Sequence, residues 1–244
     1  MLSDRQRERY ARQTAMSCLG DEGQEKLLDG TAAIVGLGGL GSAASMYLAA
    51  AGVGHLVLVD DDMVELSNLN RQVIYREADI GQPKVERAAD TLTRLNPDVA
   101  LTCHCEHIHE DNAAELLADA DVVLDCLDSF AARYVLNDAA IALRCPLVHG
   151  AVSEMHGQAM TVMPGGSACL RCVFPRAPPE RQTPVLGSIA GTIGTVQASE
   201  AVKYLVGITP LLTDMLFVYD AGCHDADHIR VERKTDCPAC GGQG

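Results

Sequence analysis

The chain contains a glycine-rich turn of the kind that holds a phosphate group, in the stretch IVGLGGLGSAASMYLAAAGVGHLVLVD. Gly36 permits a tight strand-to-helix turn, Gly38 lets the backbone approach a phosphate, and Gly41 allows close packing of helix against strand. The N-terminus of the following helix offers free N–H groups and a partial positive charge to an anion. Asp60 ends the next apolar run and can accept hydrogen bonds from ribose hydroxyls. The pattern predicts a nucleotide site, and it leaves open whether the nucleotide is a redox dinucleotide.

Basic residues follow this turn in VDDDMVELSNLNRQ and at the start of PKVE. Asn68 and Arg71 come soon after the ribose aspartate, and Lys84 stands thirteen residues beyond Arg71. An arginine and a lysine near the phosphate turn would neutralise a triphosphate and stabilise the charge that develops on leaving pyrophosphate. Single basic residues more often solvate a surface, and that interpretation stays open. We assign Asp62, in the same acidic run, to the nucleotide site as well.

Two aspartates follow an apolar run in VVLDCLDSF. Asp125 and Asp128 lie near the C-terminal end of an expected strand, at the edge where open α/β sheets bind ligands. A carboxylate there could hold Mg²⁺ that bridges nucleotide phosphates. A spacing of three places the two side chains on opposite faces if both remain in the strand, so we expect one to face the site. We choose Asp128, beyond the apolar run, and interpret Asp125 as a helix cap or loop anchor.

Four cysteines form two CxxC pairs, CLRC and CPAC, separated by a long segment. The members of the two pairs are Cys169, Cys172, Cys237 and Cys240. Two such pairs predict a tetrahedral zinc site, and a redox role is weaker because there are two pairs. Since sulfur takes all four positions, the zinc should be structural and should join the C-terminal tail to the loop region.

The segment CHCEHIHE contains further possible metal ligands. Cys103, Cys105, His107 and His109 would share one face of a strand, so a second metal site is conceivable. The alternation fits an ordinary strand that runs into a loop better, and the role of this segment, which also holds His104, is left open. The chain has no GxxxxGK[ST] motif, which disfavours phosphoryl transfer of the P-loop kind, and no GxSxG motif.

Strands that alternate with helices predict the fold that positions these groups: a doubly wound, Rossmann-like, mostly parallel sheet with antiparallel C-terminal strands. We expect helices at 1–30, 42–51, 83–96, 110–120, 129–144 and 191–207, and strands at 31–37, 55–60, 100–107, 121–128, 146–153, within 157–166 and as a pair within 214–234. The proline-rich stretch 174–184 is expected to be a loop. We expect a single domain over 1–244, made of N-terminal helices (1–30), a nucleotide-binding core (31–153), and a crossover loop, antiparallel strands and zinc-bound tail (154–244).

The composition excludes some partners. The chain of 244 residues carries a net charge of −14 and no tryptophan, which argues against a nucleic-acid partner held by general electrostatics or by base stacking. The opening MLSDRQRERYARQ is charged and resembles no signal peptide, so we expect a cytoplasmic protein. Seven glycines interrupt the apolar segment between Asp29 and Asp60, which favours a buried α/β unit over a membrane span.

Taken in order, these motifs resemble the ThiF/MoeB/HesA family, the bacterial relatives of ubiquitin-activating E1 enzymes. The resemblance covers nearly the whole chain and rests on RYARQ, GLGGLGS, LSNLNRQ, IGQPKVE, LTRLNPD, VVLDCLDS, CLRC, GTVQASEAVKYL and CPACG. It implies binding of Mg-ATP and of the C-terminal Gly-Gly of a small ubiquitin-like sulfur carrier. The carrier's carboxylate would attack the α-phosphate to give an acyl-adenylate and pyrophosphate. A sulfur donor, such as a cysteine desulfurase or a rhodanese-type protein, would then give a thiocarboxylate.

The resemblance also implies roles for individual residues. The residues that would contact the nucleotide are Gly39, Asp60, Asn68, Arg71 and Lys84. Asp128 matches the family's Mg-linked aspartate. Arg12, in RYARQ, matches an arginine that reaches into the partner subunit's site, which implies a homodimer with composite sites. Catalysis would then be mainly positioning and charge stabilisation.

Two features depart from the family pattern. The loop before GTVQA reads RAPPERQTPVLGS and holds no cysteine, so we expect adenylation without a covalent step at that loop. The common Asp-Asn after the fourth strand is Asp-Ser here, and we still place Ser129 at the nucleotide site. Three alternatives remain: an E1-like enzyme that activates a tRNA or peptide carboxylate, an NAD- or FAD-binding oxidoreductase, and a non-enzymatic nucleotide sensor that contains zinc.

Overall fold

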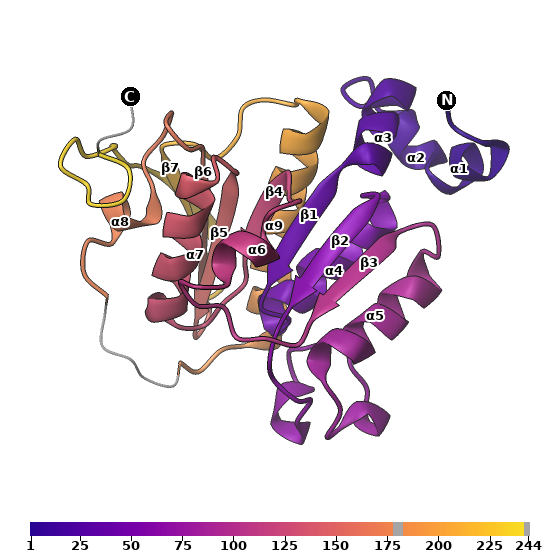
Figure 1. The fold of residues 1–244 in the computed structure, drawn as a ribbon, viewed down its shortest axis with the longest axis horizontal. Coiled ribbons are helices and arrows are strands. Elements are labelled where there is room, and N and C mark those ends of the chain that lie inside the picture. The colour runs from indigo at the N-terminus through magenta and orange to yellow at the C-terminus, as the bar shows by residue number, and fades with distance from the viewer. Residues whose placement is uncertain (178–182, 242–244) are drawn as a thin grey trace.

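The computed structural model describes residues 1–177 and 183–241, and all of its named strands belong to one sheet (Figure 1). The eight strands lie in the order β3-β2-β1-β4-β5-β6-β7-β8. They are β1 (Thr31–Val35), β2 (His55–Val59), β3 (Ala100–His104), β4 (Val122–Asp125), β5 (Leu147–Ser153), β6 (His156–Val162), β7 (Met215–Asp220) and β8 (Asp225–Arg230). Strands β3, β2, β1, β4 and β5 are parallel, and β6, β7 and β8 continue the sheet antiparallel. The predicted fold class is confirmed.

The parallel strands β1, β2 and β4 are short apolar runs that are buried on both faces, as a doubly wound sheet requires. The chain order 3-2-1-4-5 reverses direction between β1 and β4, which is the switch point where such sheets bind ligands. At this point Val35 pairs with both Val59 and Asp125. The loops that follow β1, β2 and β4 therefore emerge side by side.

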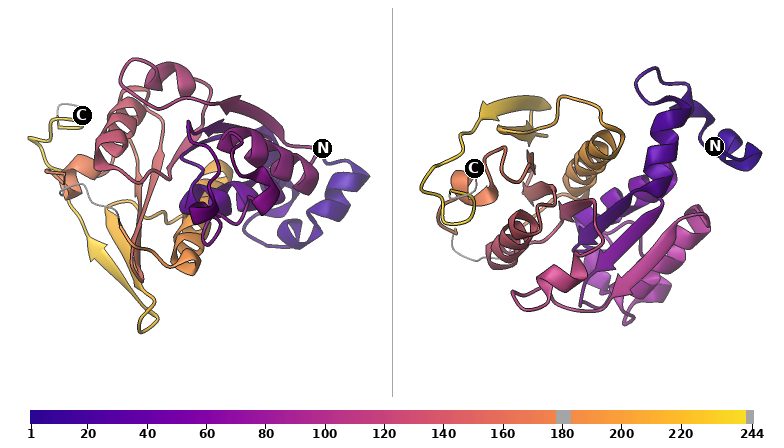
Figure 2. Two further views of the ribbon diagram at one scale, coloured as in Figure 1. Left: turned by 90° about the horizontal axis from the view of Figure 1, so that it is seen from below. Right: turned by 45° about the horizontal axis from the view of Figure 1, so that its top comes forward.

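Helices cover both faces of the sheet, with α7 on one side and α9 on the other (Figures 1 and 2). They are α1 (Asp4–Arg9), α2 (Ala11–Thr14), α3 (Gly20–Asp29), α4 (Gly39–Ala51), α5 (Lys84–Leu95), α6 (Ala113–Leu116), α7 (Phe130–Ala142), α8 (Leu170–Val173) and α9 (Gly187–Val206). Alternate residues of β1 belong to two separate apolar cores: Ile34 lies on the α4, α5 and α9 side, and Val35 on the α6 and α7 side. No described helix is long and apolar enough to cross a membrane.

Helix α4 begins at Gly39, three residues earlier than the sequence predicts, and it packs closely against α9. Glycine makes this approach possible, because a Cβ on Gly194 of α9 would overlap the carbonyl oxygen of Leu40. The first turn of α4 thereby lies under the start of α9. The glycine-rich turn is held between the sheet and this helix pair.

Other predicted boundaries differ for local reasons. Strand β3 ends at His104 rather than reaching His107, because backbone pairing with β2 stops there. The helix expected over 110–120 is reduced to the four residues of α6. The expected helix over 191–207 starts four residues earlier, at Gly187. Part of the proline-rich loop predicted at 174–184 lies outside the described residues.

The three N-terminal helices project beyond the ends of β1 and β2 from which those strands start (Figure 1). The switch-point loops lie at the opposite edge of the sheet. The first helices and the switch-point loops therefore lie at opposite ends of these strands within one chain.

Candidate nucleotide site and cysteine cluster

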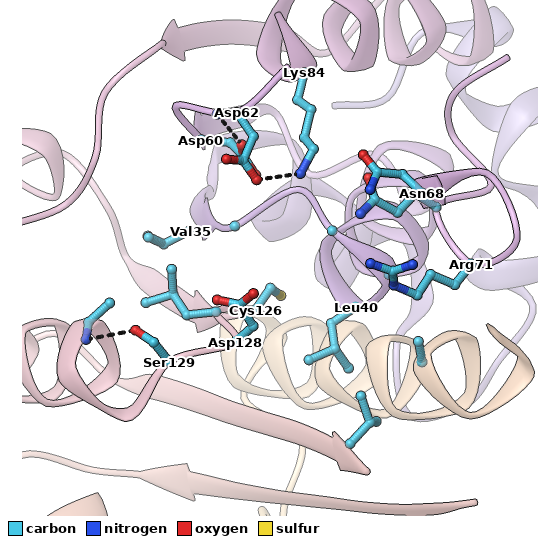
Figure 3. A pocket seen from close by; sticks show the side chains of 18 of the residues that line it. Val35, Leu40, Asp60, Asp62, Asn68, Arg71, Lys84, Cys126, Asp128 and Ser129 are labelled. Carbon is cyan, nitrogen blue, oxygen red and sulfur yellow. Dashed lines mark hydrogen bonds and ion pairs between the residues drawn. The ribbon is translucent and has the colours of Figure 1, made fainter. Parts of the chain in front are cut away.

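A cavity of about 870 Å³ opens at the carboxyl ends of β1, β2 and β4 (Figure 3). Its walls come from the glycine-rich turn, the loop after β2, the start of α5, the loop after β4 and residues 183–185. This volume lies within the range of small-molecule and cofactor sites. The cavity therefore lies where the topology predicts a ligand.

Glycine stands at these positions of the turn for different structural reasons. Gly36 has φ +90°, and a Cβ there would lie 2.7 Å from the carbonyl oxygen of Cys126. A Cβ on Gly41 would overlap the Gly36 carbonyl oxygen, which confirms that Gly41 allows close packing of helix and strand. A Cβ on Gly39 would meet Ala190 of α9 at 2.8 Å, whereas a Cβ on Gly38, which precedes the first turn of α4, would make only an ordinary contact of 3.7 Å with Nε2 of Gln72.

Asp60 is buried, and both of its carboxylate oxygens accept hydrogen bonds from the backbone. Oδ2 accepts from the N–H of Leu37 at 2.6 Å, and Oδ1 accepts from the N–H of Asp62 at 2.9 Å. Burial raises the pKa of this carboxyl, while the nearby Lys84 ammonium lowers it. The aspartate thus ties the glycine-rich turn to the loop after β2, in addition to its predicted contact with ribose.

Lys84 is the first residue of α5 and is only 4% exposed. Its ammonium group lies 2.7 Å from the Asp62 carboxylate, which itself is 68% exposed. The backbone N–H of Lys84 also donates to the Asp62 carbonyl oxygen at 3.0 Å. The predicted cation is therefore positioned at the cavity wall and stabilised by an acid that remains accessible to solvent.

Asn68 and Arg71 lie in and just after a short 3₁₀ turn (Leu66–Asn68), beside the Lys84 side chain (Figure 3). Asn68 is buried and accepts a hydrogen bond from the N–H of Glu65 at 3.1 Å. Arg71 donates to the Ser67 carbonyl oxygen at 2.9 Å. The guanidinium makes no ion pair with any of the described residues, so its charge is not neutralised by an acid from that part of the chain.

Asp128 lies in the loop between β4 and α7, and its carboxylate is in the cavity, below the glycine-rich turn (Figure 3). The side chain is exposed and makes no hydrogen bond or ion pair with residues 1–177 or 183–241. Ser129 also lines the cavity, where its hydroxyl caps α7 by accepting from the N–H of Ala132 at 3.3 Å. An unpaired carboxylate in a cavity that is also lined by Arg71, Lys84 and Arg133 is suited to a metal-bound polyphosphate.

Asp125 is fully buried and anchors the loop, as the sequence predicts. Its Oδ2 lies 2.6 Å from Nδ1 of His149, and its Oδ1 accepts from the N–H of Leu127 at 3.2 Å. Arg133, on the first turns of α7, donates to the Leu127 carbonyl oxygen. The choice of Asp128 over Asp125 as the cavity-facing acid agrees with this geometry.

Arg12 lies on α2, is exposed, and does not line the cavity of its own chain. It makes no hydrogen bond or ion pair within the part of the chain that the structure describes. The structure therefore separates Arg12 from the other predicted site residues.

The four cysteines of the two CxxC pairs come together on the α7 side of the sheet, buried, with their sulfur atoms within 4.8 Å of one another. The separations include 3.8 Å for Cys169–Cys172, 3.6 Å for Cys169–Cys237 and 3.5 Å for Cys172–Cys240. A tetrahedron with Zn–S bonds of 2.3 Å places sulfur atoms about 3.8 Å apart. The cluster thus has the ligand number and spacing for zinc.

The segment CHCEHIHE forms no second cluster among the described residues. Because the strand ends at His104, the later cysteine and histidines do not share its face. His107 instead lies at the rim of the cavity, with Nδ1 3.4 Å from the Asp61 carboxylate.

Several residues of the site were missed by the sequence analysis. Gln72 and Arg133 line the cavity, and His149 lies below it on β5. Gln72 stands directly after Arg71 in LSNLNRQ, which was a signal that could have been used. A single histidine in an apolar strand carries no comparable signal.

The fold and the cavity define the class: a doubly wound α/β protein with a glycine-rich turn at its switch point and a four-cysteine cluster near its tail. Comparison with known sequences is more specific. The chain belongs to the ThiF family, whose sequence pattern matches residues 10–239.

Named relatives cover the chain over its whole length. It is 44% identical over 249 residues to the SAMP-activating enzyme E1 of Haloferax volcanii, and the alignment covers 100% of this chain and 92% of the relative. It is 42% identical over 247 residues to the sulfur carrier protein ThiS adenylyltransferase of Escherichia coli, at 99% and 98% coverage. The adenylyltransferase and sulfurtransferase MOCS3 of Drosophila sechellia is 41% identical over 242 residues, but this chain spans only 53% of its length.

Solved structures agree on the fold. A crystal structure of E. coli MccB with MccA-N7isoASN superposes with a TM-score of 0.85 at 22% identity, covering 96% of this chain and 75% of that one. The structure of PaaA superposes with a TM-score of 0.81 at 25% identity, covering 96% and 76%.

Proposed function

We propose that this chain is an adenylyltransferase that uses Mg-ATP to adenylate the C-terminal Gly-Gly carboxylate of a small ubiquitin-like sulfur-carrier protein. Relatives named as a ThiS adenylyltransferase and a SAMP-activating E1 support this function and do not favour an oxidoreductase. The structural observation that carries the proposal is the unpaired Asp128 carboxylate, which shares one cavity with Lys84 and Arg71.

In this reaction a carboxylate oxygen of the carrier attacks the α-phosphorus of ATP. An O–P bond forms, the bond from the α-phosphorus to the bridging oxygen breaks, and pyrophosphate leaves with the electron pair. Lys84 and Arg71 would stabilise the negative charge that increases on the phosphates. Gly36, Gly38, Gly39 and Gly41 leave room for the phosphates beside the N-terminus of α4.

The nucleoside end would lie toward Asp60, with Asn68 and Ser129 at the walls. Asp62 would act through its ion pair with Lys84. Asp128 would hold Mg²⁺, which supplies charge neutralisation to the phosphates when it is bound. The free carboxylate in a cavity lined by several basic side chains fits that assignment.

Cys169, Cys172, Cys237 and Cys240 would hold a structural Zn²⁺. Their sulfur separations fit a tetrahedral site, and all four are buried, so no position is left for a substrate. The metal would fix the segment around α8 to the C-terminal tail.

Arg12 would complete the cavity of a partner subunit in a homodimer. Its exposure, its lack of a described partner, and its position at the far edge of the sheet support this arrangement. We also propose that 1–244 acts as one adenylation unit in the cytoplasm. A separate sulfur donor, such as a cysteine desulfurase or a rhodanese-type protein, would act on the adenylate, because residues 176–188 include no cysteine.

Carrier-dependent exchange of labelled pyrophosphate into ATP tests the proposal. We expect exchange with at least one Gly-Gly-ending carrier from a panel, in the presence of Mg²⁺, and none with the same carrier lacking its final glycine. Mass spectrometry of the carrier should detect the acyl-adenylate. Absence of exchange with every carrier, or exchange only with peptides or tRNA, would contradict it.

A further inference from the structure

A buried acid–imidazole pair lies directly beneath the loop that carries Asp128. Asp125 ends β4, His149 lies beside it on β5, and both side chains have no exposed surface. Oδ2 of Asp125 and Nδ1 of His149 are 2.6 Å apart. Nothing in the proposed chemistry uses this pair, although burying two polar side chains is costly unless each is hydrogen-bonded.

The pair connects to the peptide that precedes Asp128. The other carboxylate oxygen of Asp125, Oδ1, accepts from the N–H of Leu127 at 3.2 Å and lies 3.9 Å from Nε of Arg133. Arg133 donates to the carbonyl oxygen of the same residue from Nε at 3.2 Å and from Nη2 at 2.5 Å. The N–H and the carbonyl oxygen of Leu127 are therefore both hydrogen-bonded, which fixes the backbone directly before Asp128.

Asp128 itself has no described side-chain partner, so its position depends on its backbone. The nearest constraint on one side is the Leu127 peptide, and on the other it is Ser129, which caps α7. The peptide constraint depends in turn on the rotamer of Asp125, which His149 fixes from the opposite oxygen.

His149 is also held in place. Its Nε2 lies 3.4 Å from the amide nitrogen of Gln158 on β6, and its ring lies against Phe174, just after α8, at 6.4 Å between ring centroids. Burial lowers the pKa of the imidazole, although the hydrogen bond to Asp125 raises it. A neutral ring that donates from Nδ1 and accepts at Nε2 satisfies both neighbours.

We propose that His149 is a positioning residue for the nucleotide site: through Asp125 it fixes the Leu127 peptide and thereby the Asp128 carboxylate. This role of His149 belongs to the proposed adenylation, and the activity measurement that tests it rests on that reaction. It predicts that loss of the Nδ1 donor disturbs the use of Mg²⁺, and that a side chain with a donor in the same place restores it.

Three variants test this inference. His149→Leu removes the donor, and His149→Asn places an amide nitrogen near the position of Nδ1. His55→Leu is the matched control, because it removes a histidine hydrogen bond of 2.8 Å to Thr102 at the other edge of the sheet. For each variant, kcat of carrier-dependent exchange is measured against Mg²⁺ concentration, together with Tm.

We expect His149→Leu to lower kcat about tenfold or more, since small misplacements of a catalytic group have effects of this size or larger. The Mg²⁺ concentration for half-maximal exchange should rise about threefold or more, with little change in KM for the carrier. His149→Asn should lie within about threefold of the wild type in both quantities, and His55→Leu should lower only Tm. A loss of Tm in His149→Leu with unchanged kcat and Mg²⁺ dependence would overturn the inference.

A second measurement uses the wild-type chain and needs no activity. The Nδ1 proton of His149 should give a low-field proton NMR resonance, assigned by its loss in His149→Asn. Addition of Mg²⁺ with a non-hydrolysable ATP analogue should shift it, and an unshifted resonance at saturation would overturn the inference even if His149→Leu fails to fold. Failure of exchange in the wild type with a clear shift would instead contradict the proposed adenylation alone.

Discussion

The nucleotide cavity and the cysteine cluster both bring together polar side chains that are far apart in the sequence. They differ in whether these side chains are buried and whether they have partners. In the cavity, Asp128 is exposed without a described partner, and Arg71 has no acid beside it in the described chain. In the cluster, four buried sulfur atoms lie close together, at 3.8 Å within the first CxxC pair and at 3.5 and 3.6 Å between the two pairs.

The exposed, unpaired groups of the cavity and the buried thiols of the cluster suit different functions. Groups left unpaired in an open cavity can exchange their water for a ligand and release it again, as a turnover site requires. Four mutually close, buried thiols have no such freedom, and they fit a metal that stays in place. Changes in the cavity should therefore alter activity, and changes in the cluster should alter stability.

Apart from the loss of Asp128, replacement of Lys84 should give the largest effect on activity. Lys84→Met removes the buried ammonium at the cavity wall, and we expect kcat/KM for exchange to fall about 10²–10³-fold, or about 2.7–4 kcal/mol. Zinc content, measured by elemental analysis, should not change. Near-normal exchange in Lys84→Met would separate this cation from the chemistry.

Gly41→Ala should follow, because its Cβ would overlap the Gly36 carbonyl oxygen. We expect a loss of about 2–3 kcal/mol in the free energy of unfolding, together with weaker ATP binding. Gly191→Ala in α9 is the matched control, since nothing lies within 4 Å of the added atom. This control should be neutral or stabilising by up to about 1 kcal/mol, and equal behaviour of the two variants would refute the packing argument.

Cys172→Ala should act in the opposite way to Lys84→Met. We expect Tm to fall by about 5–10 °C, corresponding to about 2–3 kcal/mol in a chain of this size. The Kd for ATP at a temperature where the variant is folded should stay within about threefold. Cys18→Ala, at an exposed cysteine, is the control. A selective loss of ATP affinity in Cys172→Ala would remove the contrast between the two regions.

Asp62→Asn should have the smallest effect. The acid is largely exposed, so its ion pair with Lys84 should contribute only about 0–1 kcal/mol to stability. Because the ammonium remains in place, exchange should fall by less than about tenfold. A loss as large as that of Lys84→Met would give Asp62 a direct role with the substrate.

Much of this architecture could be predicted from the sequence, because its signals are local. The turn from Gly36 to Gly41 has a fixed spacing within one strand–turn–helix unit. The spacing within each CxxC pair is itself typical of a zinc site. Asp125 and Asp128 were told apart by where the apolar run ends, since the last residue of a buried strand turns into the interior.

What could not be predicted depends on contacts between distant segments. His149 meets Asp125 only because β5 pairs beside β4, and a lone histidine in PLVHGAVS gives no sign of that neighbour. Arg133 reaches back over the Leu127 peptide from α7, which no spacing rule anticipates. The short α6 and the early end of β3 likewise reflect where tertiary pairing stops.

The proposed function makes the free carboxylate of Asp128 essential for adenylation, independently of the cysteine cluster. Its most direct test is carrier-dependent ATP–pyrophosphate exchange by the wild type, Asp128→Ala and Asp111→Ala, with zinc measured on the same samples. Asp111 is a suitable control because its side chain is 99% exposed and outside the cavity lining. We predict that Asp128→Ala abolishes exchange while zinc stays bound, and that Asp111→Ala matches the wild type. Full activity in Asp128→Ala would contradict the account.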